Sequence, residues 1–391
     1  MTEVQQAIVN GGAVATISEE SRRRINLALA DVHAPSTRRV YARQWESFEQ
    51  YCRQHNYRSL PADIDVVCEF LQTLETTIID KPNGVTQVGY SMSYIEQALH
   101  AIRFVHRKAV AVPEPTPGAP PEPPLWLHPV PSDFVRAMRN RNAREGRLTE
   151  RPVEPLLREQ LVKVLADAAG AADTWVKHLH VRRDTAALLM GWVGAMRRSE
   201  LAALRICDVK AGYAGQWTMR VARSKTDQAG RGMIKALPRG EVAATCPQCA
   251  YVRWMECVTT YDISGRMGLI RLLTRDSVPT RHVCRQLQSY PRPRSPIFRT
   301  ITRGEIGQVA MTGNTLQNML RRRLSESFPE LDVSAYGGHS LRAGFVTEAK
   351  LRGQSDHHIM RQTGHIDPRS LRKYAREHSA FDNNAATNLG L

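Results

Sequence analysis

The stretch Gly338-His-Ser-Leu-Arg-Ala-Gly344 decides how the rest of this chain is interpreted. Its histidine, His339, stands three residues before its arginine, Arg342, so both side chains lie on one face if the segment is helical. Two other polar segments follow it, Thr363-Gly-His365 and Leu371-Arg-Lys-Tyr-Ala375. Each polar residue taken singly is more typical of a structural or surface position, so only their combination is informative.

Two upstream segments complete this combination. Arg197 lies in Gly194-Ala-Met-Arg-Arg-Ser-Glu-Leu201, and Lys225 lies in Arg223-Ser-Lys-Thr226. We choose Arg197 over its neighbour Arg198 because the acidic Glu200 follows Arg197 by one helical turn. Glu200 is therefore expected to support Arg197 from behind.

The residue types suit an attack on a phosphodiester without a metal. The planar guanidinium of arginine grips phosphate with two hydrogen bonds and keeps its charge, which makes Arg197 and Arg342 the candidates for stabilising the phosphate. Tyr374, nine residues after His365, is the candidate nucleophile. A phenol titrates near pH 10, so neighbouring cations have to favour its phenolate.

Proton transfer needs further groups. A lysine on a β-turn can supply a proton to the leaving 5′ oxygen, and Lys225 has that position. His339 is expected to accept the tyrosine proton or to hydrogen-bond the phosphate. His365 follows a glycine at a turn and is expected to donate to a nonbridging oxygen.

This set resembles the catalytic residues of the tyrosine recombinase (phage integrase) family. The segment 223–237 is similar to the hairpin of Cre-like members, and Ser295-Pro-Ile-Phe-Arg299 and the closing segment 384–391 also look like integrase segments. The catalytic resemblance covers about residues 154–391, whereas residues 30–145 match only in pattern. The residues that carry the resemblance are Arg197, Lys225, His339, Arg342, His365 and Tyr374.

The resemblance implies a mainly α fold: a helical core-binding (SAM-like) domain, followed by an α+β catalytic domain with a small antiparallel β-sheet. It implies a site-specific recombinase that cuts and rejoins DNA through a 3′-phosphotyrosine, without metal, ATP or other cofactor. The implied partner is a double-stranded DNA recombination site. Four protomers would synapse two such sites through a Holliday junction, with the segment after about Ser379 docking on a neighbour, and the free protein would be a monomer or dimer.

The composition agrees with such a partner. The chain has 391 residues, a formal net charge of +16 and a pI of about 9.9, which favours a polyanion such as nucleic acid. We expect a disordered tail at residues 1–25, a helical DNA-clamp domain at 26–150 and a catalytic domain at 151–391. No run of apolar residues is long enough to cross a membrane and no secretory signal is evident, so we expect a cytoplasmic protein, nucleoid-associated if bacterial.

Hydrophobic periodicity predicts helices from about 36, from 63 and over 91–110. The proline-rich stretch 113–124 predicts an extended connection. A further helix is expected over 131–145. It begins an Arg-rich segment that we interpret as tracking the DNA backbone, together with Arg198 of the second domain. The candidate DNA-binding residues are Arg136, Arg139, Arg141, Arg144, Arg147 and Arg198.

In the second domain, two strands are expected, 217–223 and 233–237, with a turn at 228–232. The predicted helices are 157–168, 174–193, 247–258, 313–327, 339–352, 355–362 and 367–376. The stretch 259–293 shows little periodicity and is predicted to be an insertion without regular structure.

Seven scattered cysteines predict reduced thiols. Cys246-Pro-Gln-Cys249 could bind zinc with Cys257, His282 and Cys284. An isolated C-x-x-C is more typical of a helix start with a buried thiol, so we expect no metal site.

Two other functions remain open at this point. A type IB topoisomerase shares the tyrosine chemistry but nicks and reseals a single duplex. A non-catalytic DNA-binding protein would share the charge but would have no need of Tyr374.

Overall fold

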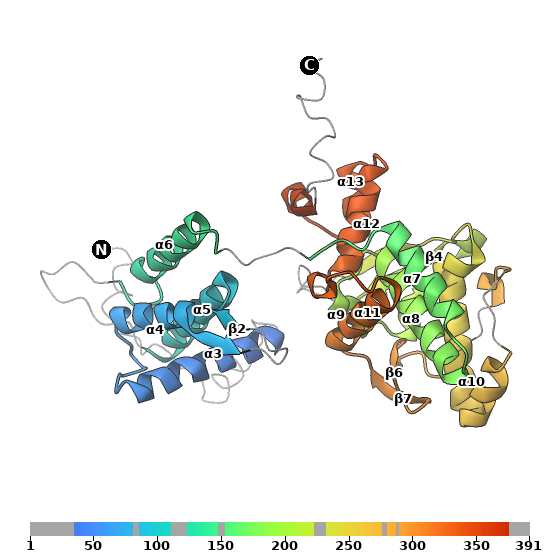
Figure 1. Ribbon diagram of the computed structural model, residues 1–391, viewed down its shortest axis with the longest axis horizontal. Helices are drawn as coiled ribbons and strands as arrows, with labels where there is room; N and C mark the ends of the chain where they lie inside the picture. Colours follow the sequence, from blue (N-terminus) through green and yellow to red (C-terminus); the bar gives the residue numbers. More distant parts are fainter. Residues whose placement is uncertain are drawn as a thin grey trace, which may run out of the picture. The chain divides into compact units, whose positions relative to one another are not determined.

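The structure is a computed structural model that describes residues 35–80, 86–110, 123–147, 153–222, 232–275, 280–286 and 289–374. Its contacts divide the chain into two compact units, Met1–Glu150 and Arg151–Leu391 (Figure 1). Four expectations fall outside the described residues: the tail, most of the proline-rich stretch, most of the 228–232 turn and the docking segment after Ser379. No helix in the described part is both long and apolar enough to cross a membrane.

The first unit is helical, with one small hairpin. Asp63 and Ser91 begin two of its helices by accepting hydrogen bonds from backbone N–H groups in the first turn, as N-caps do. Aromatic and aliphatic side chains from the helices form one core, with Phe48, Leu71 and Ile95 fully buried. The elements are α3 Pro35–Gln54, α4 Ile64–Thr76, β1 Ile78–Asp80, β2 Thr86–Val88, α5 Met92–Ala109 and α6 Val130–Arg144.

The second unit is built from helices around a larger core, and the small sheets lie among them (Figure 1). Asp184 ties two of its helices together, because its buried carboxylate accepts hydrogen bonds from Arg322 and Arg323 on α11. The α-helices are α7 Arg158–Gly170, α8 Trp175–Val193, α9 Arg198–Ala203, α10 Pro247–Leu273, α11 Gly313–Ser327, α12 Ser340–Leu351 and α13 Asp356–Thr363. The 3-10 helices are η1 Ile206–Asp208, η2 Tyr213–Gly215, η3 Ala243–Thr245, η4 Cys284–Gln286, η5 Val333–Ala335 and η6 Pro368–Tyr374.

The expected pair of strands is present in a three-stranded antiparallel sheet of order β3-β4-β5. Its strands are β3 Val209–Lys210, β4 Trp217–Val221 and β5 Met233–Leu237, and Met219 lies opposite Lys235. A second antiparallel pair, β6 Arg299–Thr302 and β7 Glu305–Ala310, was not predicted. The fold is therefore mainly helical with small antiparallel sheets, as expected.

The prediction of an irregular insertion from residue 259 is wrong as far as residue 273, because α10 continues to Leu273. The backbone is not helical at Gly265, with φ 62°, where two helical segments meet at a kink, and Leu273 beyond the kink is fully buried. The helix is also tied down by Asp262, which accepts hydrogen bonds from the buried Arg299 and from Tyr290. These partners are distant in sequence, so the local pattern did not predict them.

Two of the predicted helices that carry candidate site residues differ from the prediction. His339 lies at the N-cap of α12, outside the helix rather than in its first turn. The segment 367–376 was expected to be an α-helix, but as far as Tyr374 it is the 3-10 helix η6. Gly344 of α12 packs closely against the backbone of Leu156. A Cβ at this position would lie 1.8 Å from the Leu156 carbonyl oxygen, so the close approach requires glycine.

Candidate active site

Arg342 is the centre of the candidate site and is fully buried on α12. Its Nη1 donates to the carbonyl oxygens of Ala195, at 2.9 Å, and Thr363, at 2.7 Å. Its Nη2 lies 2.9 Å from Nε2 of His365. A buried guanidinium whose donors face three groups on two different segments is held in one orientation, which is what rigid recognition of phosphate requires.

The bend that precedes Arg197 supplies one of these contacts. Helix α8 ends at the C-cap Gly194, and Ala195 then adopts a left-handed conformation with φ 45°. Such a conformation is uncommon for a residue with a Cβ and often occurs at functional sites. Here it accompanies the reversal between α8 and α9, and the Ala195 carbonyl receives the hydrogen bond from Arg342.

Arg197 stands at the N-cap of α9, and Glu200 holds it as predicted. The Arg197 Nη1 donates to Glu200 Oε1 at 2.6 Å, and its backbone N–H donates to Glu200 Oε2 at 3.1 Å. The Arg197 side chain keeps 18% of its surface exposed, whereas the Glu200 side chain keeps 3%. Glu200 therefore fixes the guanidinium from inside while part of Arg197 stays open to a ligand.

His365 follows the left-handed C-cap Gly364 of α13. Because arginine has only donors, Nε2 of His365 accepts from Arg342, and Nδ1 carries the proton that it donates to the Thr363 hydroxyl at 2.8 Å. Burial and the nearby charges of Arg342 and Arg197 lower the pKa of His365 to about 3. His365 is therefore neutral near pH 7, and its Nε2 accepts a hydrogen bond from Arg342 in this arrangement, while its donation to a nonbridging oxygen stays a prediction.

Lys235 is a candidate site residue that the sequence analysis missed. It lies on β5 with only 1% of its surface exposed, and its Nζ donates to the Gln362 carbonyl at 2.7 Å. Burial lowers the pKa of Lys235 to about 7, and the positive charges of Arg342 and Arg197 act in the same direction, whereas Glu200 opposes them. The alternation of β5 was a usable signal, because it places residue 235 on the inner face of that strand.

The six predicted catalytic residues are thus brought together in part. His365 lies within electrostatic reach of Arg342, Arg197 and His339. Tyr374 is the last residue of η6, and its backbone alone is described. Lys225 lies outside the described residues.

The candidate DNA-binding arginines of the first unit have acidic neighbours. Arg139 pairs with Glu96 at 2.6 Å, and Arg141 pairs with the buried Glu75. The pairs Arg136–Asp133 and Arg147–Glu145 also form, whereas Arg144, in the last turn of α6, is exposed. These ion pairs offset part of the charge that the sequence suggested, so composition alone overstated the positive potential of α6.

Arg198, in the second unit, is held by uncharged groups. Its Nη1 donates to Gln317 Oε1 at 2.8 Å and to Asn314 Oδ1 at 3.3 Å. The glycines at 313 and 338 leave room for its side chain, since a Cβ on either would crowd it. Arg198 therefore keeps its full charge on the surface beside the start of α12.

Comparison with known proteins shows what the whole chain is similar to. No family model matches the chain. The chain is 25% identical over 374 residues to the "Integrase/recombinase xerD homolog" of Selenomonas ruminantium, which covers 95% of this chain and 89% of that protein. Over most of its length the chain is similar to a protein of the tyrosine recombinase/integrase family. It is thus a homologue of tyrosine-type site-specific recombinases, as the sequence resemblance implied, while the Cre-like likeness of its hairpin stays a prediction.

A search of solved structures found a recombinase structure with a similar fold. The structure of the XerH site-specific recombinase bound to palindromic difH substrate, in a post-cleavage complex, matches with a TM-score of 0.50 and 15% identity, covering 90% of this chain and 78% of that one. A λ integrase dimer bound to a COC′ core site matches with a TM-score of 0.45 and 13% identity, covering 91% of this chain and 93% of that one.

Proposed function

We propose that this recombinase cleaves and rejoins DNA strands at a specific site through a 3′-phosphotyrosine at Tyr374. The phenolate oxygen of Tyr374 attacks phosphorus, the bond from phosphorus to the 5′ oxygen breaks, and the freed 5′ oxygen takes a proton. A 5′ hydroxyl of the partner duplex then reverses the reaction. The phosphotyrosine conserves the energy of the broken bond, so neither ATP nor a metal is needed.

The convergence of Arg197, Arg342 and His365 in one site is the observation that supports this proposal most. Negative charge on the nonbridging oxygens grows as the phosphorane forms, and fixed guanidinium groups offset it without reorganising. Arg197 and Arg342 are both fixed, the first by Glu200 and the second by backbone carbonyls.

The histidines are assigned to proton transfer and phosphate contact. A bound phosphate places negative charge near His365 and so raises the pKa that burial and the arginines lower. His365 is then able to gain a proton and donate to a nonbridging oxygen. His339 is assigned to receive the proton of Tyr374.

We assign the proton for the 5′ oxygen to Lys225 and a positioning role to Lys235. The buried ammonium of Lys235 bridges β5 to the end of α13 through the Gln362 carbonyl, and Gln362 also bonds the backbone of β5 at Ala236. These bonds hold the segment that leads to Thr363 and His365. Lys235 therefore acts on the reaction by fixing the partners of Arg342.

The proposal extends to the assembly. The homologous λ integrase was crystallised as a dimer on DNA. We propose that two such dimers of this protein synapse as a tetramer on two sites. Arg144 and Arg198 are the strongest candidates for contacts with the DNA backbone, and Arg136, Arg139, Arg141 and Arg147 would contact DNA only by exchanging their acidic partners for phosphate.

A nicked suicide substrate tests the reaction. The nick lets a short 5′-hydroxyl fragment diffuse away, so covalent protein–DNA adducts accumulate and the attached DNA can be sequenced. Tyr374→Phe is expected to abolish these adducts and to leave DNA binding within about twofold, because only the phenolic oxygen is removed. Tyr336→Phe, at a buried tyrosine of the same unit, is the matched control. Adducts formed by Tyr374→Phe would show that another residue is the nucleophile.

The same material separates the alternatives. Relaxation of supercoiled DNA that lacks any preferred site would favour the type IB topoisomerase reaction. Tight DNA binding without adducts from the unmodified chain would favour a non-catalytic binding protein.

A further inference from the structure

Four potential metal ligands from two distant segments lie together in the second unit, apart from the residues assigned to catalysis. Cys246 and Cys249 flank the first turn of α10, and His282 and Cys284 come from the segment 280–286. One ligand atom from each of the four residues lies within 4.8 Å of every other. The three cysteines are buried and none is in a disulfide.

We propose that Cys246, Cys249, His282 and Cys284 bind one structural zinc ion. A tetrahedral site with Zn–S bonds of about 2.3 Å and Zn–N bonds of about 2.0–2.1 Å separates two sulfurs by roughly 3.8 Å, and a sulfur and a nitrogen by roughly 3.5 Å. The Cys249 and Cys284 sulfurs lie 3.5 Å apart. The His282 Nδ1 lies 3.3 Å from the Cys249 sulfur and 3.7 Å from the Cys284 sulfur. The spacing is thus that of a closed zinc site.

The surroundings orient the ligands as zinc sites require. The Nε2 of His282 faces the Glu241 carbonyl at 3.2 Å, so it carries the proton and leaves Nδ1 with a free lone pair toward the sulfurs. A backbone carbonyl in this position is a usual outer partner of a metal-bound histidine. The tautomer that binds a metal through Nδ1 is therefore the one that the Glu241 contact selects.

Backbone N–H groups point at two of the sulfurs. The N–H of Gly240 donates to Cys246 Sγ at 3.3 Å, and the N–H of Val283 donates to Cys249 Sγ at 3.3 Å. Such bonds stabilise thiolates, which are the form that zinc binds. Gly240 also has to be glycine for this approach, since a Cβ there would lie 2.8 Å from the Cys246 Cα.

A fourth buried cysteine, outside the cluster, shows what an ordinary buried thiol of this unit looks like. Cys257 is also fully buried on α10, but it packs in the main hydrophobic core and contacts the Arg182 guanidinium at 3.6 Å. It is not one of the four clustered ligands. The contrast indicates that the other three cysteines are arranged for a shared ligand rather than for packing.

The ion would fasten three pieces of chain to each other. These are the segment after β5 with Gly240 and Glu241, the start of α10, and the segment 280–286. Segment 280–286 contacts the first two pieces through His282, Val283 and Cys284. Zinc would therefore stabilise the region between α10 and β6, and its role is structural because all four positions are filled by protein.

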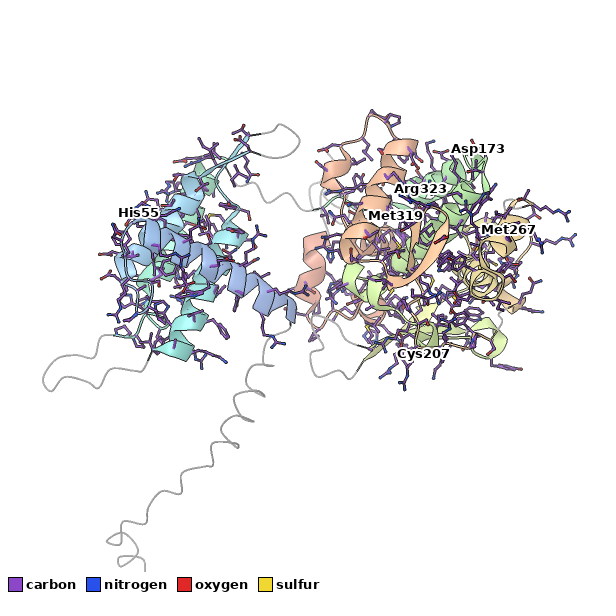
Figure 2. All side chains as sticks on the ribbon, turned by 90° about the horizontal axis from the view of Figure 1, so that it is seen from below. His55, Asp173, Cys207, Met267, Met319 and Arg323 are labelled. Atoms are coloured by element: carbon purple, nitrogen blue, oxygen red, sulfur yellow. The ribbon has the colours of Figure 1, made fainter. Side chains whose placement is uncertain are left out.

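Metal analysis of the full-length chain, purified under reducing conditions without chelator or an added metal, tests the proposal. The expected result is about one zinc per chain by mass spectrometry of the metal. Cys249→Ser and Cys284→Ser are expected to lose it. Cys257→Ser and Cys207→Ser, at a buried and an exposed cysteine, are expected to keep it (Figure 2 labels Cys207). Zinc retained by both ligand variants, or lost in both controls, would refute the assignment.

A second measurement keeps the test decisive if a ligand variant does not fold. Zinc is removed from the wild-type chain with a thiol reagent and chelator, the thiols are regenerated, and Co²⁺ is added. The expected result is the set of intense visible bands of tetrahedral Co²⁺ with thiolate ligands, which one equivalent of Zn²⁺ abolishes. A zinc-free native chain with no such bands, or with a disulfide among the three clustered cysteines, would overturn the proposal. Because adduct formation at Tyr374 is measured separately, failure of either proposal is distinguishable from failure of the other.

Discussion

Replacing the buried Lys235 by methionine should make the second unit more stable near neutral pH while slowing DNA cleavage. Lys235 is 1% exposed, and burial holds its pKa near 7 instead of 10.5. That difference corresponds to about 5 kcal/mol of destabilisation when the group is charged. Methionine has a similar length and no charge, although it leaves the Gln362 carbonyl without the Lys235 donor, which costs ~1–3 kcal/mol.

The sign of the pH effect follows from proton binding. Between the folded pKa and the unfolded pKa, the unfolded chain holds the Lys235 proton and the folded chain does not, so the wild type becomes more stable as pH rises through this window. Below the folded pKa the full penalty remains. Going from about pH 6 to about pH 9 should therefore stabilise the wild type by about 3 kcal/mol relative to Lys235→Met.

Urea unfolding of both proteins at these two pH values measures the effect, and the suicide-substrate assay measures the cleavage rate. Lys210→Met, at an exposed lysine on β3 of the same sheet, is the matched control, and its difference from wild type should be the same at both pH values. If the stability difference between wild type and Lys235→Met does not change with pH, Lys235 is not a buried titrating group. If cleavage by Lys235→Met is as fast as by wild type, Lys235 does not position the site.

Two further predictions concern α12 and His365. Gly344→Ala should destabilise the second unit by several kcal/mol, about the range of severe core substitutions, because the new Cβ would lie 1.8 Å from the Leu156 carbonyl oxygen. Gly170→Ala, where a Cβ meets nothing within 4 Å, should be neutral or slightly stabilising in the same urea titration, and equal effects at the two sites would contradict the packing of α12. The fold lowers the pKa of His365 from 6.5 to about 3, so below about pH 6.5 the unfolded chain binds a proton that the folded chain does not. The wild type should therefore lose stability relative to His365→Gln as pH falls from 7 to 5. A stability difference that is constant over this range, measured by urea unfolding, would show that His365 is not held neutral by the fold.

Much of the local structure could be read from the sequence. Asp63 and Ser91 were recognisable as helix starts, and both cap helices. The alternation in 217–223 and 233–237 predicted β4 and β5. The Glu200 contact with Arg197 was predictable because the two residues lie three positions apart at the start of one helix. These successes share a cause, since each depends on residues within a few positions of one another.

Predictions that depended on distant partners were incomplete or wrong. The continuation of α10 depends on Arg299 and Tyr290, which meet Asp262 only in the folded chain. The sequence did not predict that Arg139 pairs with Glu96 or that Arg141 pairs with Glu75, because each pair joins different helices. Likewise, C-x-x-C alone was a weak signal for a metal, and only folding brings Cys284 and His282 to it.

The sequence by itself indicated the resemblance to tyrosine recombinases, because the types of the candidate site residues and their order along the chain are properties of short segments. It could not determine the protonation states or orientations of those residues. Burial keeps His365 neutral and lowers the pKa of Lys235. Carbonyl groups on other segments fix the orientation of the Arg342 guanidinium. Tertiary structure decided these features, since desolvation and long-range hydrogen bonds exist only once distant segments pack together.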